Sequence, residues 1–144
     1  MVGSCSNCIL AEELWDSHQN WYGTVGGPFI RNHDPQGTTL YGLDITVHPD
    51  FRKIGIGRAF YEARFELVDA IGLRRFGTGC RLPDFAQSGL GSAGDYALEV
   101  VAGKRTDRTL TPLLRYGLLF KSVRYEYMED VESGNAAAIL ECKP

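Results

Sequence analysis

The sequence lacks the features that would place the protein in a membrane, outside the cell or on nucleic acid. No apolar run approaches ~18 residues, the length that a membrane-spanning helix needs, and no basic segment followed by an apolar stretch opens the chain as in a secretion signal. Lys and Arg do not outnumber Asp and Glu, and the net charge is −3, so neither nucleic acid nor an anionic membrane is expected as a partner. Val2 rules out N-myristoylation and Cys142 lies one position too late for prenylation, so a cytoplasmic protein is expected.

The chain also has few cysteines, at positions 5, 8, 80 and 142. Cys5 and Cys8 have the spacing that opens a zinc site, but no second Cys/His pair has ligand spacing. If both lie on a strand, they face opposite sides of it, which prevents joint ligation. Thiols are often buried as small apolar side chains. We therefore predict buried, reduced cysteines, with neither a metal site nor a disulfide.

What is present is an ordinary globular composition, with 44% hydrophobic and 23% charged residues over 144 positions. This length fits one domain with a substantial core, and no linker, repeat or low-complexity tract divides residues 1–144. Alternation and turn residues predict strands at 2–12, 38–47, 73–80, 118–127 and 137–142, the last two as an antiparallel pair. Periodicity and capping residues predict an irregular segment at 13–38 and helices at 56–71, 92–102 and 107–117. The helix at 56–71 has two apolar ridges, one of which contains Leu67 and Ile71, and is therefore expected to be covered on two sides.

A glycine corner joins the strand ending at Val47 to the helix beginning at Ile56. Its sequence, Arg52-Lys53-Ile54-Gly55-Ile56-Gly57, places free backbone N–H groups, a helix N-terminus and basic side chains around one small concavity. Backbone donors and the positive helix end attract anions, and glycines let the backbone approach a pyrophosphate closely. The segment lacks the Gly-Lys-Ser/Thr of a Walker loop and the third glycine of a dinucleotide fingerprint. We interpret it as a phosphate-binding loop of another type, the alternative being an ordinary strand–turn–helix corner.

The glycine corner resembles the acetyl-CoA pyrophosphate loop of the GCN5-related N-acetyltransferase (GNAT) superfamily. Two further segments resemble, more narrowly, the acetyltransferase-type domains joined to carbon–nitrogen hydrolases in some bacteria: Asn32-His33-Asp34-Pro35 before Leu40-Tyr41-Gly42, and Gly79-Cys80-Arg81-Leu82-Pro83. The similarity spans residues 2–144 and is strongest at 31–83. It implies an α+β (three-layer α/β) fold, with a mixed, largely antiparallel central sheet and helices on both faces.

One departure from the family pattern concerns the N-terminus. Such domains usually begin with a strand and one or two helices before the strand expected at 2–12, and this sequence starts too late to supply them. Those elements normally cover part of the sheet and wall the acceptor site. Since a soluble monomer avoids an open apolar face and an open sheet edge, we predict a homodimer in which a partner subunit or a swapped segment covers the gap.

The resemblance also implies where the cofactor lies, between the strands ending at Val47 and Cys80. The pantetheine of acetyl-CoA would pair with backbone groups of Ile45, Thr46 and Val47 like an added strand. Its pyrophosphate would accept N–H groups of the loop residues Arg52, Lys53, Ile54, Gly55, Ile56, Gly57 and Arg58. The Arg52 side chain fits a solvated turn charge equally well. No metal is implied.

The implied chemistry is attack of an amine on the thioester carbonyl, helped by positioning, by backbone N–H groups at the strand end that stabilise the oxyanion, and by a base. Asp44 is the first candidate base, because the family often carries an acid on this strand; its alternative is a surface carboxylate. Tyr41 is a second candidate. The family's usual general acid is a tyrosine four residues before the glycine of Gly-x-x-Phe, where this sequence has Leu113. Tyr116 and Tyr125 are candidates to replace it, or are core rings with a bonded hydroxyl.

The segment 13–38 is rich in aromatic residues, which either line an acceptor pocket, form a subunit contact or pack over the sheet: Trp15, Trp21, Tyr22 and Phe29. The histidines share no ligand spacing, and local hydrogen bonds are expected for His33 and His48. The first hypothesis for function is an N-acetyltransferase that moves an acetyl group from acetyl-CoA to a small or peptide amine. The second is a non-catalytic acyl-CoA-binding or regulatory module, and the third is a dimeric interaction protein that has lost the cofactor.

Overall fold

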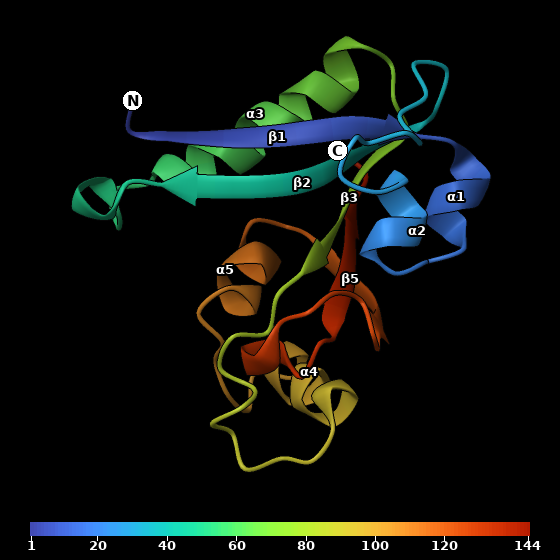
Figure 1. The fold of residues 1–144 in the computed structure, drawn as a ribbon. Coiled ribbons are helices and arrows are strands. Elements are labelled where there is room, and N and C mark those ends of the chain that lie inside the picture. Colours follow the sequence, from blue (N-terminus) through green and yellow to red (C-terminus); the bar gives the residue numbers. More distant parts are fainter.

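The computed structural model describes residues 1–144 and contains one five-stranded sheet with helices on both faces (Figure 1). The elements in chain order are β1 (Gly3–Leu10), α1 (Glu12–Asp16), α2 (Trp21–Val25), β2 (Thr39–Val47), α3 (Ile56–Ala70), β3 (Arg75–Cys80), α4 (Ala93–Val101), α5 (Leu110–Arg115), β4 (Leu119–Arg124) and β5 (Ala137–Cys142). Short 3₁₀ turns lie at Pro49–Phe51 and Val131–Ser133. None of the helices has the length and apolar character to cross a bilayer.

The sheet has the strand order β1-β2-β3-β5-β4, and only the β2–β3 pair is parallel. The predicted mixed, largely antiparallel sheet is therefore confirmed, as is the antiparallel pairing of the last two strands. The parallel pairing runs only from Thr39, opposite Arg75, to Gly42, opposite Thr78. Beyond that point β2 diverges from β3, and α5 lies in the angle between them (Figure 1). This divergence opens the sheet on the side where β2 ends.

A β-bulge in β2 lies where the two strands begin to diverge. Ser6 pairs with Asp44 and the next residue, Asn7, pairs with Gly42, so Leu43 has no partner on β1. Because an extra residue changes which side of the strand the following side chains face, the bulge resets the alternation from Asp44 onward.

Two hydrophobic clusters cover the opposite faces of the sheet. Leu40 belongs to the larger cluster, together with residues of α3, α4 and α5. Its neighbour Tyr41 belongs to the smaller cluster, together with Trp15 of α1 and Val25 of α2. Since successive residues of a strand face opposite sides, these memberships place helices on both faces, as predicted.

All the predicted strands and helices are present, with ends that differ by up to three residues, and two further predictions differ from the structure. Segment 13–38, expected to be irregular, contains most of α1 and all of α2; Asn20 caps the N-terminus of α2 by accepting a hydrogen bond from the Gly23 N–H. Within the single chain, helix 56–71 is covered on one side and not on the two sides predicted. Only its ridge at Tyr61, Arg64 and Val68 is buried, and the outer ridge leaves Leu67 and Ile71 exposed. All four cysteines are unpaired thiols; Cys8 and Cys80 are buried as predicted, whereas Cys5 and Cys142 are only partly buried.

A buried ion network fixes the start of β3 to its neighbours. The Arg75 guanidinium donates to Glu12 Oε1 at 2.6 Å and to Thr39 Oγ1 at 2.9 Å. Its Nε lies 3.2 Å from Glu141 Oε2 on β5. The network therefore joins α1, β2, β3 and β5 at the end of the sheet remote from the divergence.

This network predicts acid sensitivity that depends on Glu12. The hydrogen bond from Arg75, assisted by one from Thr38, lowers the pKa of Glu12 from its ordinary 4.5 to about 2. Because the folded protein binds this proton less readily than the unfolded chain, the contribution of Glu12 to stability is present above about pH 4.5 and is lost as the pH falls toward 2. In urea titrations over that range, the midpoint should fall less steeply for Glu12→Gln than for the wild type. Equal slopes would contradict this role for Glu12.

Candidate active site

The glycine corner presents a row of backbone donors that the protein itself does not use. Lys53 and Gly55 have the left-handed φ values of 65° and 94°, and α3 begins directly after Gly55 with no side-chain cap. The backbone N–H groups of residues 53–58 donate to no acceptor in the protein. Since the first N–H groups of a helix have no intrahelical partner, this corner is built to bind an anion.

These donors border a cleft of about 700 Å³ between the end of β2 and α5. Every residue predicted to bind the cofactor lines it except Ile54, whose side chain is exposed: Ile45, Thr46, Val47, Arg52, Lys53, Gly55, Ile56, Gly57 and Arg58. Arg108 adds a further positive charge from the opposite wall, and no carboxylate lines the cleft. The cleft therefore suits a long, negatively charged ligand.

Two of these basic side chains are held by contacts within the chain. Arg52 Nε donates to the Val47 carbonyl at 3.0 Å, which favours a structural role in the turn for this side chain. Arg58 Nε lies 3.2 Å from Glu62 one helical turn on. Arg108 is likewise paired, with Asp84 and Glu132. The anion site therefore rests mainly on backbone N–H groups, with Lys53 as the basic side chain that makes no ion pair within the chain.

A second cavity, of about 410 Å³, fills the divergence between β2 and β3. It shares Ile45, Tyr61, Thr109 and Leu113 with the cleft, and we call these four residues the waist. A ligand lying in the cleft can therefore extend its end through the waist into the cavity. This is the geometry required to present the reactive end of a long cofactor to a second molecule.

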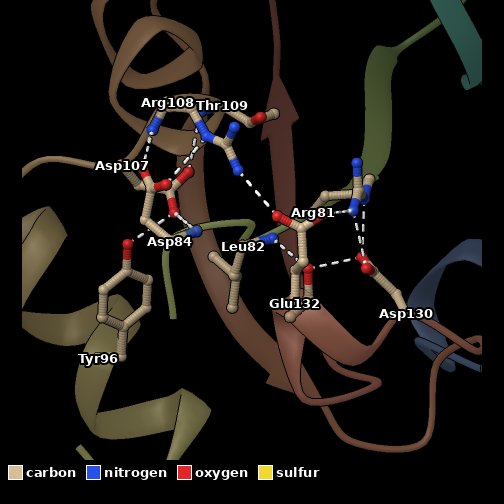
Figure 2. Close-up of polar contacts among 10 residues, drawn as sticks. Arg81, Leu82, Asp84, Tyr96, Asp107, Arg108, Thr109, Asp130 and Glu132 are labelled. Carbon is tan, nitrogen blue, oxygen red and sulfur yellow. Dashed lines mark hydrogen bonds and ion pairs between the residues drawn. The ribbon is translucent and has the colours of Figure 1, made fainter. Parts of the chain in front are cut away.

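A polar network holds the loops that wall the cavity (Figure 2). Arg81 donates to both oxygens of Asp130, at 2.7 and 2.8 Å, and these hydrogen bonds lower the pKa of Asp130. In Figure 2, Arg108 lies across Asp84, its Nε 2.9 Å from Asp84 Oδ1, and also reaches Glu132 at 3.0 Å. These contacts link the loop after β3, the start of α5 and the loop between β4 and β5.

Buried Asp107 holds the N-terminus of α5 by accepting hydrogen bonds from its first backbone N–H groups. Its Oδ1 accepts the N–H groups of Thr109 and Leu110 at 2.8 and 2.9 Å, as expected for the predicted cap. Its Oδ2 accepts the Tyr96 hydroxyl at 2.6 Å. Thr109 is thereby held at the waist.

The three predicted catalytic residues lie in three different environments. Asp44 lines the second cavity with an exposed side chain, and its carboxylate accepts a hydrogen bond from the Ser6 hydroxyl. Tyr116 lines the cleft, where its ring lies 5.4 Å from that of Tyr61. Tyr41 is buried, lines neither cavity and contacts the hydroxyl of Tyr127. The structure therefore brings Asp44 and Tyr116 to the joined cavities and leaves Tyr41 in the core.

Sequence reasoning did not select three residues that the structure places at the second cavity. Tyr61 is at the waist, and burial raises its pKa to about 12. Tyr127 lines the cavity, and burial raises its pKa to about 12. Arg64 lines the cavity one helical turn after Tyr61. The only sequence signal was that Tyr61 and Arg64 lie three residues apart on one face of a helix. The same spacing is found in ordinary core packing.

The aromatic residues of segment 13–38 divide between the core, the cavity and the surface. Trp15 is buried, Trp21 lines the second cavity, and Tyr22 and Phe29 are exposed. The two histidines make the local hydrogen bonds that were expected. His33 Nδ1 accepts from the Ile9 N–H at 3.0 Å, and His48 Nδ1 accepts from the Asp50 N–H at 3.1 Å.

Comparison with known proteins finds two bacterial relatives in sequence. No family model matches the chain. It is 34% identical to the uncharacterized N-acetyltransferase YkwB of Bacillus subtilis over 99% of the chain, and 28% identical to the probable hydrolase YhcX of the same organism over 98%. The chain spans 64% of the length of the first relative and 28% of the second.

Solved structures show the same fold. The GNAT-like decarboxylase GphF, solved with isobutyryl-CoA, superposes with a TM-score of 0.76 at 22% identity, covering 99% of this chain and 72% of that one. A GNAT family acetyltransferase of Elizabethkingia anophelis, solved with acetyl-CoA, superposes with a TM-score of 0.52 at 13% identity, covering 76% of this chain and 64% of that one. The chain therefore has the fold of solved GNAT-like proteins, and its sequence is similar to that of an uncharacterized N-acetyltransferase.

Proposed function

We propose that the protein is an acetyl-CoA-dependent N-acetyltransferase acting on a small or peptide amine. The observation that carries the proposal is the row of unused backbone N–H groups at residues 53–58, in a basic cleft that joins a second cavity at the waist. The corner would bind the pyrophosphate, and the cleft would hold the pantetheine. The second cavity would receive the acetyl group and the amine.

The end of β2 offers a free edge for the pantetheine. β2 pairs with β1 as far as Val47, but its other edge has no strand partner beyond Gly42. Backbone groups of Ile45 to Val47 on that edge would pair with the amides of the pantetheine. Such pairing would put the thioester near the waist, beside the bulge at Leu43.

In the proposed reaction the acceptor nitrogen attacks the thioester carbonyl, the C–N bond forms and the C–S bond breaks. Unpaired backbone N–H groups of β2 would stabilise the oxyanion. Asp44 would remove the proton from the acceptor amine, directly or through water. Among the tyrosines, Tyr61 is the best placed to protonate the departing sulfur. It lies at the waist, and a pKa of about 12 keeps it protonated at neutral pH.

Thermal unfolding with CoA and acetyl-CoA tests the first half of the proposal. A ligand at a hundredfold its Kd adds about 2.7 kcal/mol to the stability of the folded state, so a clear rise in Tm is expected. Release of free thiol in a screen of amines then tests transfer. Binding without turnover on any amine would favour the acyl-CoA-binding module, and no shift with either ligand would contradict both functions.

The base assignment predicts a kinetic effect without a binding effect. Asp44→Asn should lower kcat by about 10²-fold or more, the usual contribution of a general base, and leave the Kd of CoA unchanged. Asp50→Asn is the matched control, because Asp50 is an exposed carboxylate in the turn that follows β2 and lines neither cavity. Steady-state thiol release on the best acceptor measures both variants. Full activity of Asp44→Asn would exclude Asp44 as the base.

We also propose that residues 1–144 form one acyltransferase domain that acts in the cytoplasm as a homodimer. The outer edge of β1 has no strand partner, and Leu67 and Ile71 are exposed on the outer face of α3. An open edge and an exposed apolar ridge are features that natural proteins usually cover. Light scattering coupled to size exclusion measures the mass in solution, and a monomer at micromolar concentration would contradict the dimer.

A further inference from the structure

Arg64 is a buried cation at the wall of the second cavity. Its side chain is 3% exposed, and its guanidinium lies 5.0 Å from the ring centre of Tyr61 and 5.2 Å from that of Phe76. Its Nη2 donates to the backbone carbonyls of Asp44, at 2.7 Å, and Ser6, at 3.2 Å. Arg64 thus ties together the two strands at the bulge through Nη2 alone.

The Arg64 guanidinium has only neutral partners within the chain. Nε is buried without a hydrogen bond, and Nη1 has no hydrogen-bond partner either. No carboxylate forms an ion pair with it, whereas the other buried arginine, Arg75, pairs with Glu12 and Glu141. Burying a charge without an opposite charge is costly, and the two neutral carbonyls and the two aromatic rings offset only part of that cost. An anionic ligand in the cavity would supply the missing partner.

The cavity is open beside the unused donors because residue 42 is a glycine. A Cβ at Gly42 would lie 3.3 Å from Arg64 Nη1 and 2.8 Å from the Phe76 ring. Both Gly42 and Arg64 line the cavity, and Arg64 does not line the cleft beyond the waist. The donors are therefore positioned for a group that has passed the waist.

We propose that Arg64 binds a carboxylate inside the second cavity, carried either by the acyl chain of a CoA thioester or by the amine acceptor. The assignment rests on the proposed function of the two cavities. A guanidinium suits this role, since it is always charged and its planar donors match a carboxylate. The cavity's own carboxylate, that of Asp44, accepts a hydrogen bond from Ser6 and makes no ion pair with Arg64. The second arginine of the cavity, Arg81, is already paired with Asp130. The preferred ligand would thus be a carboxylated acyl-CoA or an amino acid.

Calorimetry on the full chain with two stable thioethers tests whether the acyl chain carries the carboxylate; we call this the acyl arm of the experiment. S-(2-carboxyethyl)-CoA and S-(2-carbamoylethyl)-CoA have the same shape, and only the first is charged at its tip. We expect the carboxylate to bind about tenfold more tightly than the amide, with unmodified CoA as the reference, because charge-assisted hydrogen bonds are stronger than neutral ones. The acceptor arm compares β-alanine with β-alaninamide, with and without saturating CoA. A preference in either arm supports the proposal and identifies the carrier of the carboxylate.

Substitution of Arg64 separates this role from its structural one. Arg64→Gln should remove the preference for carboxylate while CoA still binds, and Arg64→Lys should keep part of it. A preference that persists in folded Arg64→Gln would overturn the proposal. If that variant does not fold, the wild type still decides, since a carboxylate-to-amide ratio within threefold in both arms overturns it. Failure of CoA itself to bind would contradict the proposed function, and the acceptor arm without CoA would still test Arg64.

Discussion

Gly57→Leu is expected to abolish CoA binding while leaving the fold intact or slightly more stable. Gly57 lies in the first turn of α3 and lines the cleft, and a Cβ added there would meet no atom within 4 Å. A leucine side chain would therefore occupy the space assigned to the pyrophosphate without disturbing the protein. Because glycine is a poor helix former, the free energy of unfolding should rise by about 0.5–1 kcal/mol. Denaturant titration measures that change, and calorimetry with CoA measures the loss of binding.

Gly91→Leu is the matched control for this experiment. Gly91 is an exposed loop glycine that also has open space around its Cβ position, and it lines neither cavity. CoA should bind this variant as it binds the wild type. Gly55 is less informative, because its φ of 94° would strain any other residue. Unchanged affinity of Gly57→Leu for CoA would remove the phosphate assignment of the glycine corner.

Arg75→Met is expected to lower the free energy of unfolding by about 3–5 kcal/mol, the usual cost of removing one partner of a buried ion pair. Arg75 is 4% exposed and contacts Glu12, Thr39 and Glu141, so its loss leaves Glu12 and Glu141 without their central cation. Since a domain is stable by about 5–15 kcal/mol, this is a large fraction of the total. Guanidinium chloride titration of purified protein measures the difference.

Arg74→Met is the matched control, because it removes the same charge from an exposed neighbouring position. The Arg74 guanidinium lies 3.4 Å from the same Glu12, but its side chain is 63% exposed. Exposed ion pairs contribute about 0–1 kcal/mol, so Arg74→Met should change stability little. If the two variants were equally stable, the buried network would not be what holds the start of β3 in place.

Local signals were sufficient to predict most of the fold. Alternation, capping residues and glycines predicted the strands and the long helices, because these features depend on residues within one or two turns of each other. The same signals failed on α3, where two apolar ridges have the same period. Only the position of the sheet decides that Tyr61 and Val68 face inward while Leu67 and Ile71 stay exposed.

The catalytic candidates were harder to choose, because their positions depend on contacts between distant segments. Tyr41 faces the core, where it meets Tyr127, a residue from the loop before β5. Asp44 follows the bulge at Leu43, and no sequence pattern indicates which side of the strand it faces afterwards. The distinction between a cavity residue and a core residue could not be drawn from adjacent positions alone.

The sequence by itself was enough to locate the glycine corner, because the local path of the chain exposes the backbone N–H groups at a turn. It was also enough to predict the order in which strands and helices follow one another along the chain. Tertiary structure alone decided that β2 and β3 part after Gly42, that a second cavity opens there and that Arg64 lies on its wall. The physical reason is distance along the chain. Strands that pair over four residues and then diverge leave a space whose walls come from segments more than sixty residues apart, such as Gly42 and Thr109.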